Sequence, residues 1–509
     1  MKKEHKKGIG TVILYIFLSL LIILGYACFF SANWFIKVYG NIGFDSIIYT
    51  LFSNLNGVEN DIIKDYCINA LLPIVLLSFL TCLFIFAKPK KPIFLTLFKI
   101  KLKVYPIKKW LISVLSIYLS LNLILIAAHH SGLVKYTLSY INAGRVYEDN
   151  YVYPEDVKIE FPENKRNLIY IFLESMETSF ISSELGGGSK NNLIPNLYSL
   201  AQENINFSTN NGIGGIYSVY GTSWTVGAMV GQTSGAHLHI PLGLDGNKFS
   251  DYFSEFLPGL TTINDILHDN GYYQEIMFGS DASFGSRREY FSQHGVDKIF
   301  DIFTARENGY ISNDYSVWWG FEDTKLFEYA KKELISISAD ASRPFAFTML
   351  TADTHHIAGY KCPDCQNDYS EQYENVISCS DKKVFEFIKW IQSQPFYNNT
   401  TIVICGDHPT MDNGYIERNI PSDYSRTIYN CFINTVAKTS NTKNRKPCVF
   451  DMFPTTLAAV GCEIEGNRLG LGVNLFSDQQ TLTEKLGSVS YLNGELSRRS
   501  VFYEKNLLK

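Results

Sequence analysis

The stretch that decides the fold is LIYIFLES, residues 168–175. Its first six residues form a continuous apolar run without polar alternation, which predicts a strand buried on both faces, as in a parallel sheet covered by helices. Two later runs have the same character, PFAFTML at 344–350 and TTIVIC at 400–405. We expect all three to be strands of one sheet.

Helical patterns separate these runs. They cover Ile194–Glu203, Leu260–Asn270, Thr324–Ser336 and Lys382–Gln394. Strands that alternate with helices indicate an α/β fold with a mostly parallel sheet flanked by helices.

Each predicted strand is followed by polar, chemically versatile residues. The first run ends in Glu174 and Ser175, the second leads into TADTHH at 351–356, and the third leads into Gly406, Asp407 and His408. Ligands of open α/β sheets bind at the carboxyl ends of the strands. Carboxylate and imidazole groups gathered there predict a site for Zn²⁺ or Mn²⁺ rather than a thiolate site.

A candidate nucleophile lies in YGTSWTVGAM, residues 220–229. A turn of small residues leads there into an apolar, helix-compatible run, and a helix N-terminus offers free N–H groups to a phosphate. A bound metal would lower the pKa of a hydroxyl group and make it nucleophilic. Thr222, Ser223 and Thr225 are equivalent on these grounds, because each could also be a helix cap.

Three apolar stretches precede this region, at residues 11–30, 67–87 and 110–128. Each is long enough to cross the hydrocarbon layer of a membrane as a helix. A cleaved signal peptide would explain the first stretch but not the other two. We expect a transmembrane domain at 1–130, a connector at 131–165, a catalytic domain at 166–480 and a tail at 481–509 that is either docked or disordered.

The charge distribution predicts the orientation in the membrane. Residues 1–110 hold 14 basic and 5 acidic side chains, and the basic ones gather at the N-terminus and in the connector at 88–109. Positive segments stay in the cytoplasm, so three spans would place everything after about residue 130 outside. The rest of the chain holds 31 basic and 45 acidic side chains, which argues against a nucleic-acid partner.

Three of the ten cysteines, Cys362, Cys365 and Cys379, cluster in the predicted outer part. A structural zinc site usually has four ligands, and no fourth ligand stands at suitable spacing. In an oxidising compartment we therefore expect a disulfide among these three.

Four ordered motifs carry a family resemblance: Leu-Glu-Ser at 173–175, Gly-Thr-Ser-Trp-Thr at 221–225, Asp-Thr-His-His at 353–356 and Gly-Asp-His-Pro at 406–409. Together they resemble the bacterial phosphoglycerol transferase I and lipoteichoic acid synthase-like family of the sulfatase/alkaline-phosphatase superfamily. The resemblance runs from about residue 165 to Phe476 and implies the alkaline-phosphatase-like fold.

The resemblance also assigns roles. It implies that Thr225 is the catalytic nucleophile and that the metal ligands are Glu174, Thr225, Asp407 and His408. The residues expected to bind substrate are His355, Arg287, Asp281, His356 and Trp224. At Arg287 the chain has Gly285 where the family has a tryptophan two residues earlier, and Asp281 differs from the family spacing by about one residue. His356 is either a further substrate contact or a residue that orients His355.

The implied reaction is a two-step transfer. Thr225 would attack the phosphate of phosphatidylglycerol, hold the glycerophosphoryl group covalently, and pass it to a hydroxyl of an envelope glycan or lipid-linked acceptor. The expected cofactor is Mn²⁺, with Zn²⁺ or Mg²⁺ as alternatives. The expected location is the cytoplasmic membrane of a bacterium, with the catalytic domain in the periplasm or outside the cell.

Three other functions make different demands on the sequence. A sulfatase would need a Cys/Ser-x-Pro-x-Arg sequence, which the chain lacks. A phosphoethanolamine transferase acting on an envelope glycan or lipid A-type acceptor would share the fold, metal and threonine, and stays an alternative. A non-enzymatic binding module is disfavoured because every expected ligand and the nucleophile are present.

Overall fold

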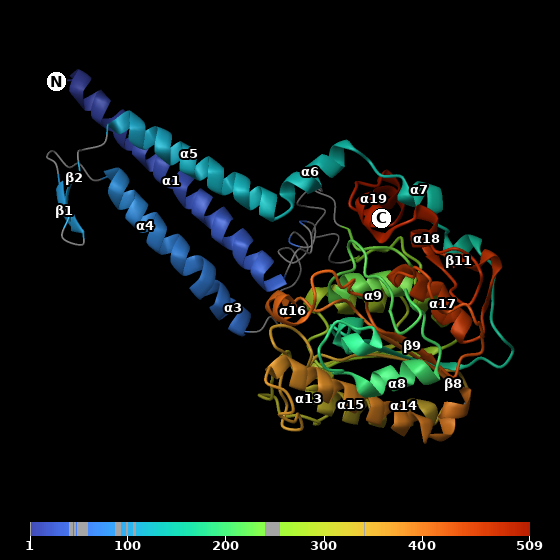
Figure 1. The fold of residues 1–509 in the computed structure, drawn as a ribbon. Helices are drawn as coiled ribbons and strands as arrows, with labels where there is room; N and C mark the ends of the chain where they lie inside the picture. The colour runs from blue at the N-terminus through green and yellow to red at the C-terminus, as the bar shows by residue number, and fades with distance from the viewer. Residues whose placement is uncertain are drawn as a thin grey trace. The chain divides into compact units, whose positions relative to one another are not determined.

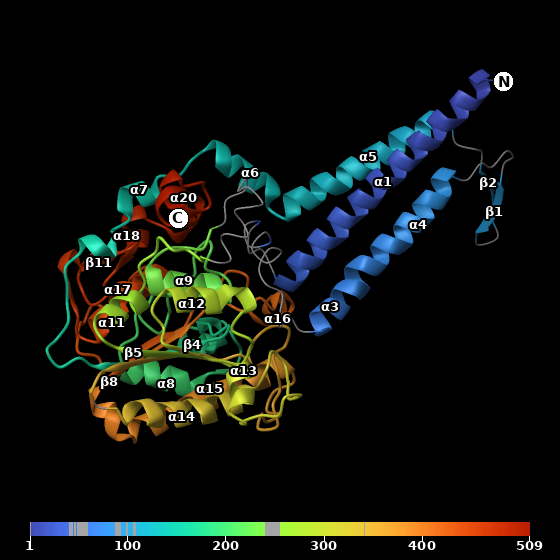
Figure 2. The same cartoon turned by 180° about the vertical axis from the view of Figure 1, so that it is seen from behind.

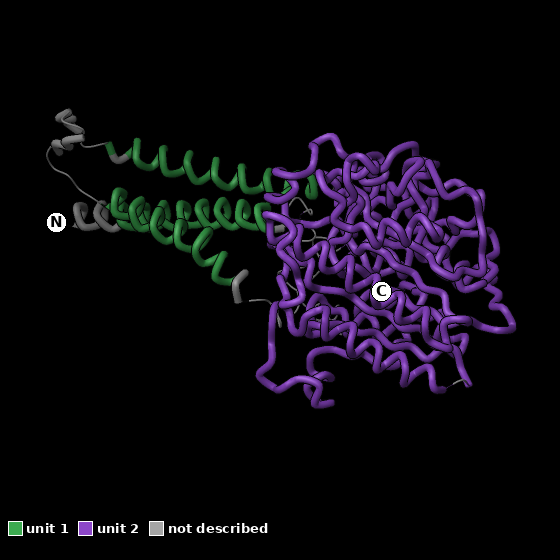
Figure 3. Tube along the Cα trace, turned by 60° about the horizontal axis from the view of Figure 1, so that its bottom comes forward, with its two compact units in different colours: residues 1–41, 59–137 green, residues 42–58, 138–509 purple. Residues whose placement is uncertain are grey.

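A computed structural model of the chain describes residues 2–39, 60–86, 93–97, 100–104, 108–239, 255–340 and 342–508, together with Phe44 and Ile47. The chain divides into two compact units, residues 1–41 with 59–137 and residues 42–58 with 138–509 (Figure 3). The division at 137/138 lies inside the connector predicted at 131–165.

The first unit contains the three predicted apolar helices. They are α1 (Lys2–Tyr39), the pair α3 (Asn60–Tyr66) and α4 (Leu72–Phe86) joined by a π-helical turn at Cys67–Leu71, and α5 (Lys109–His130). Among the described residues, three segments are long and apolar enough to cross a membrane: Gly10–Val38, Ile63–Phe86 and Trp110–His130. Within the lysine-rich connector, β1 (Ile93–Leu97) pairs with β2 (Ile100–Val104) in antiparallel fashion.

The second unit is built on a six-stranded sheet with the order β6-β5-β7-β4-β8-β9. The strands are β4 (Asn167–Leu173), β5 (Tyr273–Phe278), β6 (Lys298–Phe300), β7 (Phe345–Leu350), β8 (Thr400–Gly406) and β9 (Asn430–Ile433). All neighbours are parallel except β8 and β9. The predicted mostly parallel sheet is confirmed, and the three runs read from the sequence are its three adjacent strands β7, β4 and β8.

Helices cover both faces of this sheet (Figures 1 and 2). One face carries α8 (Pro195–Glu203), α14 (Asp323–Ser338) and α15 (Gln372–Gln392), and the other carries α9 (Thr225–Ser234), α11 (Ile263–Asp269), α12 (Arg287–Gln293) and α17 (Met452–Ala459). Alternate residues of β4 enter separate cores: Tyr170 and Phe172 pack on the α9 side, whereas Ile169 and Ile171 pack on the α15 side. A strand with two cores has no solvent face, which explains its unbroken apolar sequence.

Helix α6 (Leu133–Ile141) contains the boundary between the two units. The remaining elements of the second unit are α7 (Val146–Asn150), β3 (Ile159–Glu160), α13 (Ile302–Glu307), α16 (Asn413–Asn419), β10 (Glu463–Ile464), β11 (Arg468–Leu469), β12 (Gly472–Val473), α18 (Leu482–Leu486), α19 (Val489–Leu496) and α20 (Val501–Asn506). One predicted helix differs from the sequence expectation, because α15 begins at Gln372 rather than Lys382. Its first turns are buried through Tyr373 and Val376, an apolar face interrupted by polar residues that the sequence pattern alone does not mark as helical.

The C-terminal tail is docked rather than disordered. Leu492 and Leu496 of α19 and Tyr503 of α20 are buried and belong to the core on the α9 side. The side chain of Asn493 accepts a hydrogen bond of 2.8 Å from the N–H of Tyr220, in the loop before α9. The tail therefore supports the segment that carries the candidate nucleophile.

We predict that Leu496→Ala destabilises the folded chain by about 2–5 kcal/mol, because it leaves a cavity in a closed core. Thermal unfolding of the full chain in detergent, followed by near-ultraviolet circular dichroism, measures the loss. Tyr491→Ala on the same helix is the control, because Tyr491 is 55% exposed. Equal midpoints for the two variants would contradict the docked tail.

Candidate functional site

The carboxyl ends of β4 and β8 place two carboxylates and an imidazole together. Leu173 pairs in register with Gly406, so Glu174 follows one strand where Asp407 and His408 follow the other. One ligand atom from each of these three buried residues lies within 4.8 Å of the others. His408 Nε2 is 3.6 Å from Glu174 Oε1 and 3.4 Å from Asp407 Oδ2. The structure thus brings together three of the four predicted metal ligands.

Ser175 connects the two carboxylates. Its backbone N–H donates to Asp407 Oδ1 at 2.7 Å, and its hydroxyl donates to Glu174 Oε1, also at 2.7 Å. The residue has a φ of 54°, a left-handed conformation that costs a non-glycine residue free energy. In this conformation the N–H and the hydroxyl of Ser175 point at Asp407 and Glu174, and the two hydrogen bonds fix the positions of both carboxylates.

The electrostatics of the cluster fit a divalent cation. Burial and the charge of Glu174 raise the pKa of Asp407 well above its ordinary value, and burial lowers the pKa of His408. Asp407 Oδ2 is buried without a hydrogen-bond partner among the described residues. His408 Nδ1 lies 2.9 Å from the carbonyl of Pro409, which leaves Nε2 as a lone-pair donor toward the carboxylates. A bound cation would satisfy both the orphaned oxygen and this nitrogen.

Thr225, the fourth predicted ligand, is the first residue of α9, and its hydroxyl faces the same cluster. Thr225 Oγ1 donates to Glu174 Oε2 at 3.2 Å and lies 3.4 Å from His408 Nε2. By contrast, Thr222 Oγ1 donates to the carbonyl of Val219 within its own turn and is buried. The structure therefore distinguishes Thr225 from Thr222, two of the hydroxyls that sequence chemistry left equivalent.

A close backbone approach shapes the N-terminus of α9. A Cβ atom at Gly227 would lie 2.5 Å from the carbonyl oxygen of Gly221, so only glycine fits at this position. The first N–H groups of a helix have no partner within it and carry the positive end of its dipole. Thr225 thus stands where an anionic group can be held close to its hydroxyl.

The loop after β7 carries the histidine pair. The rings of His355 and His356 are stacked at 4.4 Å, and that of Trp319 packs against His355 at 4.7 Å. Burial and the neighbouring imidazoles of His355 and His408 hold the pKa of His356 well below its ordinary value. His356 is therefore neutral at pH 7, whereas His355 is partly exposed.

Asp281 lies in the loop after β5, and Arg287 is the first residue of α12, which follows that loop. Phe284 in this loop packs on Trp319, which in turn packs on His355. The Arg287 guanidinium is buried and donates to the carbonyls of Phe284 and Asp281 and to the hydroxyl of Ser280. Arg287 thus holds its own turn, and its role as a phosphate ligand stays a prediction.

The remaining predicted substrate contacts are also placed. Asp281 Oδ1 accepts the N–H of Ser283, and Trp224 is partly buried directly before α9. The roles of both in substrate binding stay predictions.

Sequence reasoning missed the hydrogen bonds that hold the segments behind Glu174, Asp407 and His408, which we call the acid cluster. The buried Glu177 accepts two hydrogen bonds from Arg426, at 2.8 and 2.6 Å, and one from the N–H of Thr410 at 3.1 Å. The hydroxyl of Tyr373 donates to Thr410 Oγ1 and to the carbonyl of Thr354. These contacts tie the segments after β4, β7 and β8 together. Glu177 stands three residues after Glu174, and this proximity was the one signal available.

Comparison with known proteins gives the family. The family model for Sulfatase matches residues 166–461. Phosphoglycerol transferase I of Xanthomonas euvesicatoria pv. vesicatoria (strain 85-10) is 32% identical over 272 residues, 52% of this chain and 36% of that protein. Phosphoglycerol transferase I of Salmonella choleraesuis (strain SC-B67) is 30% identical over 271 residues, 52% of this chain and 33% of that protein. The matched region spans about a third of the length of these relatives.

Solved structures resemble the chain more distantly. The Streptococcus pyogenes phosphoglycerol transferase GacH, in complex with sn-glycerol-1-phosphate, has 14% identity and a TM-score of 0.40, covering 74% of this chain and 92% of that chain. The phosphoethanolamine transferase EptA of Neisseria meningitidis has 12% identity and a TM-score of 0.49, covering 88% and 84%. At these scores neither resemblance assigns an activity.

We predict that Asp407→Asn lowers the affinity of the full chain for Mn²⁺ by at least about 100-fold, since changes even to the partners of ligands cost 10- to 100-fold. Titration of Mn²⁺ followed by electron paramagnetic resonance measures the affinity. Asp423→Asn is the control, because Asp423 is exposed on a loop outside the cluster. If both variants bound Mn²⁺ like the wild type, the cluster would not be the metal site.

Proposed function

This chain belongs to the sulfatase family, and on that premise we propose that it is a metal-dependent phosphoglycerol transferase. It moves a glycerophosphoryl group from phosphatidylglycerol to a hydroxyl of an envelope glycan or lipid-linked acceptor. The observation that carries the proposal is the position of Thr225, whose hydroxyl lies at a helix N-terminus and 3.2 Å from Glu174 in a buried acid cluster. The names of the curated relatives support glycerophosphate as the group transferred.

The residues that would hold the cation are Glu174, Asp407, His408 and Thr225. A divalent cation bound there lowers the pKa of a coordinated hydroxyl and offsets negative charge on phosphoryl oxygens. Oxygen and nitrogen donors suit Mn²⁺, which we propose, as well as Zn²⁺ or Mg²⁺.

The reaction proceeds in two displacements at phosphorus. Thr225 Oγ gives up its proton and attacks the lipid phosphorus, the bond from phosphorus to the diacylglycerol oxygen breaks, and that oxygen takes up a proton as diacylglycerol leaves. An acceptor hydroxyl then gives up its proton and attacks the same phosphorus, the bond from phosphorus to Thr225 Oγ breaks, and Oγ takes up a proton to restore the threonine. The N–H groups at the start of α9 and the side chain of His355 stabilise the charge on the phosphoryl oxygens in both steps.

The membrane segments suit this donor. Three helices long enough to span a bilayer anchor the chain in the membrane that contains the lipid. With the lysine-rich connector in the cytoplasm, the catalytic unit lies on the outer side of a bacterial cytoplasmic membrane. An anchored enzyme takes its donor from the bilayer and needs no soluble activated substrate.

The first experiment is intact-mass spectrometry of the full-length chain in phosphatidylglycerol micelles with Mn²⁺ and without acceptor. We expect the wild type to gain one glycerophosphoryl group and Thr225→Ala to gain none. Phosphatidylethanolamine micelles are the control for the head group. A gain with phosphatidylethanolamine alone would make the chain a phosphoethanolamine transferase, and no gain with either lipid would overturn the covalent scheme.

We also predict that His355→Asn lowers the rate of diacylglycerol release by about 10²–10³-fold, the usual loss when one donor to a developing oxyanion is removed. The rate is measured in the same micelles by quantifying diacylglycerol over time. His268→Asn is the control, because His268 is exposed on α11. A matching loss in both variants would mean that the effect is not specific to the site.

A further inference from the structure

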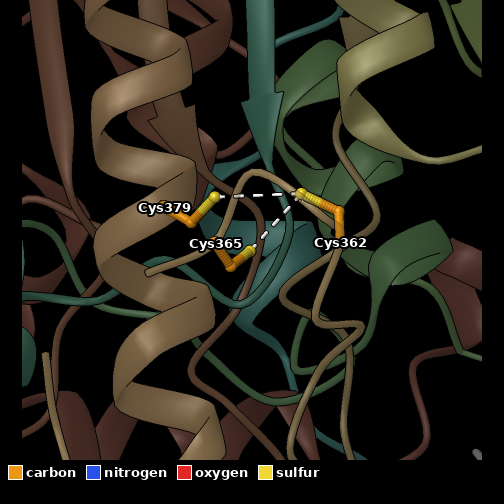
Figure 4. A group of neighbouring side chains, drawn as sticks. All are labelled: Cys362, Cys365 and Cys379. Carbon is orange, nitrogen blue, oxygen red and sulfur yellow. Dashed lines mark hydrogen bonds between the residues drawn. The ribbon is translucent and has the colours of Figure 1, made fainter. Parts of the chain in front are cut away.

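A second cluster of ligand-type side chains lies apart from the acid cluster. Cys362 and Cys365 come from the loop after His355 and His356, and Cys379 comes from α15; Figure 4 shows their three sulfur atoms converging. Cys362 Sγ is 3.4 Å from Cys365 Sγ and 4.0 Å from Cys379 Sγ, and all three atoms lie within 4.8 Å of one another. The sequence predicted a disulfide here, but in the structure all three residues are free thiols.

The spacing of the sulfurs suits a common central atom. With Zn–S bonds of about 2.3 Å in a tetrahedral site, neighbouring sulfurs stand about 3.8 Å apart. The two sulfur–sulfur distances above lie on either side of this value. A disulfide would join only two of the cysteines and leave the third, whose sulfur also lies within 4.8 Å of the other two, without a role.

The local backbone holds the first two cysteines in place. They form a Cys-x-x-Cys turn in which the N–H of Cys365 donates to the carbonyl of Cys362 at 3.1 Å. Cys362 is 2% exposed and Cys365 is 7% exposed. Such paired cysteines on a short turn are a usual half of a thiolate metal site.

The partly buried ammonium of Lys383 lies beside the thiols and offsets their charge. Lys383, one turn after Cys379 on α15, places its ammonium 3.0 Å from Cys362 Sγ and 3.1 Å from Asp353 Oδ2. Three thiolates and a divalent ion carry a net charge of about −1, which an adjacent ammonium offsets.

We propose that Cys362, Cys365 and Cys379 bind one thiophilic divalent cation, Zn²⁺, at a site separate from the acid cluster. Soft thiolate donors select Zn²⁺ over Mn²⁺ or Mg²⁺, so the two sites hold different ions. Three protein ligands leave one tetrahedral position, and the partial exposure of Cys379 opens it to water.

This ion positions the catalytic loop. It joins the segment that follows His355 and His356 to α15, and Lys383 links the cluster to Asp353 in the same loop. Asp323 accepts the N–H groups of Ala352 at 2.7 Å and Asp353 at 3.1 Å. The loop is therefore fixed at its start by Asp323 and at its end by the thiolates, and the histidine pair lies between these two anchors.

The test uses full-length protein purified in detergent and reloaded with Co²⁺ in place of Zn²⁺. Thiolate-to-cobalt charge transfer gives near-ultraviolet absorption that oxygen and nitrogen ligands do not give. We expect this absorption in the wild type and in Asp407→Asn, at one equivalent of thiolate-bound metal, and its loss in Cys365→Ser. Cys67→Ser, which changes an exposed cysteine of the first unit, is the matched control and keeps the absorption.

Two results would overturn the proposal. One is the absence of the charge-transfer band from correctly folded, reduced wild-type protein. The other is a disulfide among the three cysteines, found by peptide mapping of protein isolated without reductant. The proposal is tested apart from the proposed function. Asp407→Asn removes one carboxylate of the acid cluster and retains the thiols, so loss of glycerophosphoryl transfer and loss of the thiolate-bound metal are separate outcomes.

Discussion

The structure depends on one constraint: β7, β4 and β8 are adjacent and parallel, so whatever follows them emerges at the same edge of the sheet. Because both faces of these strands are covered, their length and register are fixed by apolar packing on two sides. The positions of the polar residues directly after each strand are fixed in turn, because the strand ends are fixed. The pairing of the strands brings residues 174, 355 and 408 to one edge, and contacts of Glu177, Tyr373 and Asp323 then hold the segments after the strands.

The convergence creates an electrostatic problem that a cation resolves. Two carboxylates in a closed space cannot both ionise without a compensating charge, and burial with the charge of Glu174 accordingly raises the pKa of Asp407. The contacts around the pair do not neutralise it, because Ser175 supplies hydrogen bonds and His408 supplies a lone pair. By contrast, the nearby Glu177 is paired with Arg426 and is therefore complete without a ligand. The unpaired acids lie beside Thr225, and the paired acid lies behind them.

The sequence was informative where a residue's role depends on its own strand. The three buried runs predicted the central strands, and the residues after them predicted the acid cluster and the histidine pair. The hydroxyl of Thr225 could not be chosen from local chemistry, because the choice depends on which side chain faces Glu174 across the sheet edge. Trp319, Arg426 and Asn493 were out of reach for the same reason. Each reaches the site or a residue beside it through folding of a distant segment, and none follows a strand or belongs to a motif.

The loop between β7 and α15 runs from the edge that holds the acid cluster to the thiol cluster. These two sets of metal donors have opposite character. The first residues of the loop present the imidazoles of His355 and His356 beside hard oxygen ligands, and its later residues present the thiols of Cys362 and Cys365. Hard and soft donors bind different ions, so each set can be filled without competing for the other's metal. Lys383 of α15 links the two ends of this loop, since its ammonium contacts both Asp353 and Cys362. A change in the charge of the thiol cluster therefore acts on the same ammonium that holds Asp353, two residues before His355.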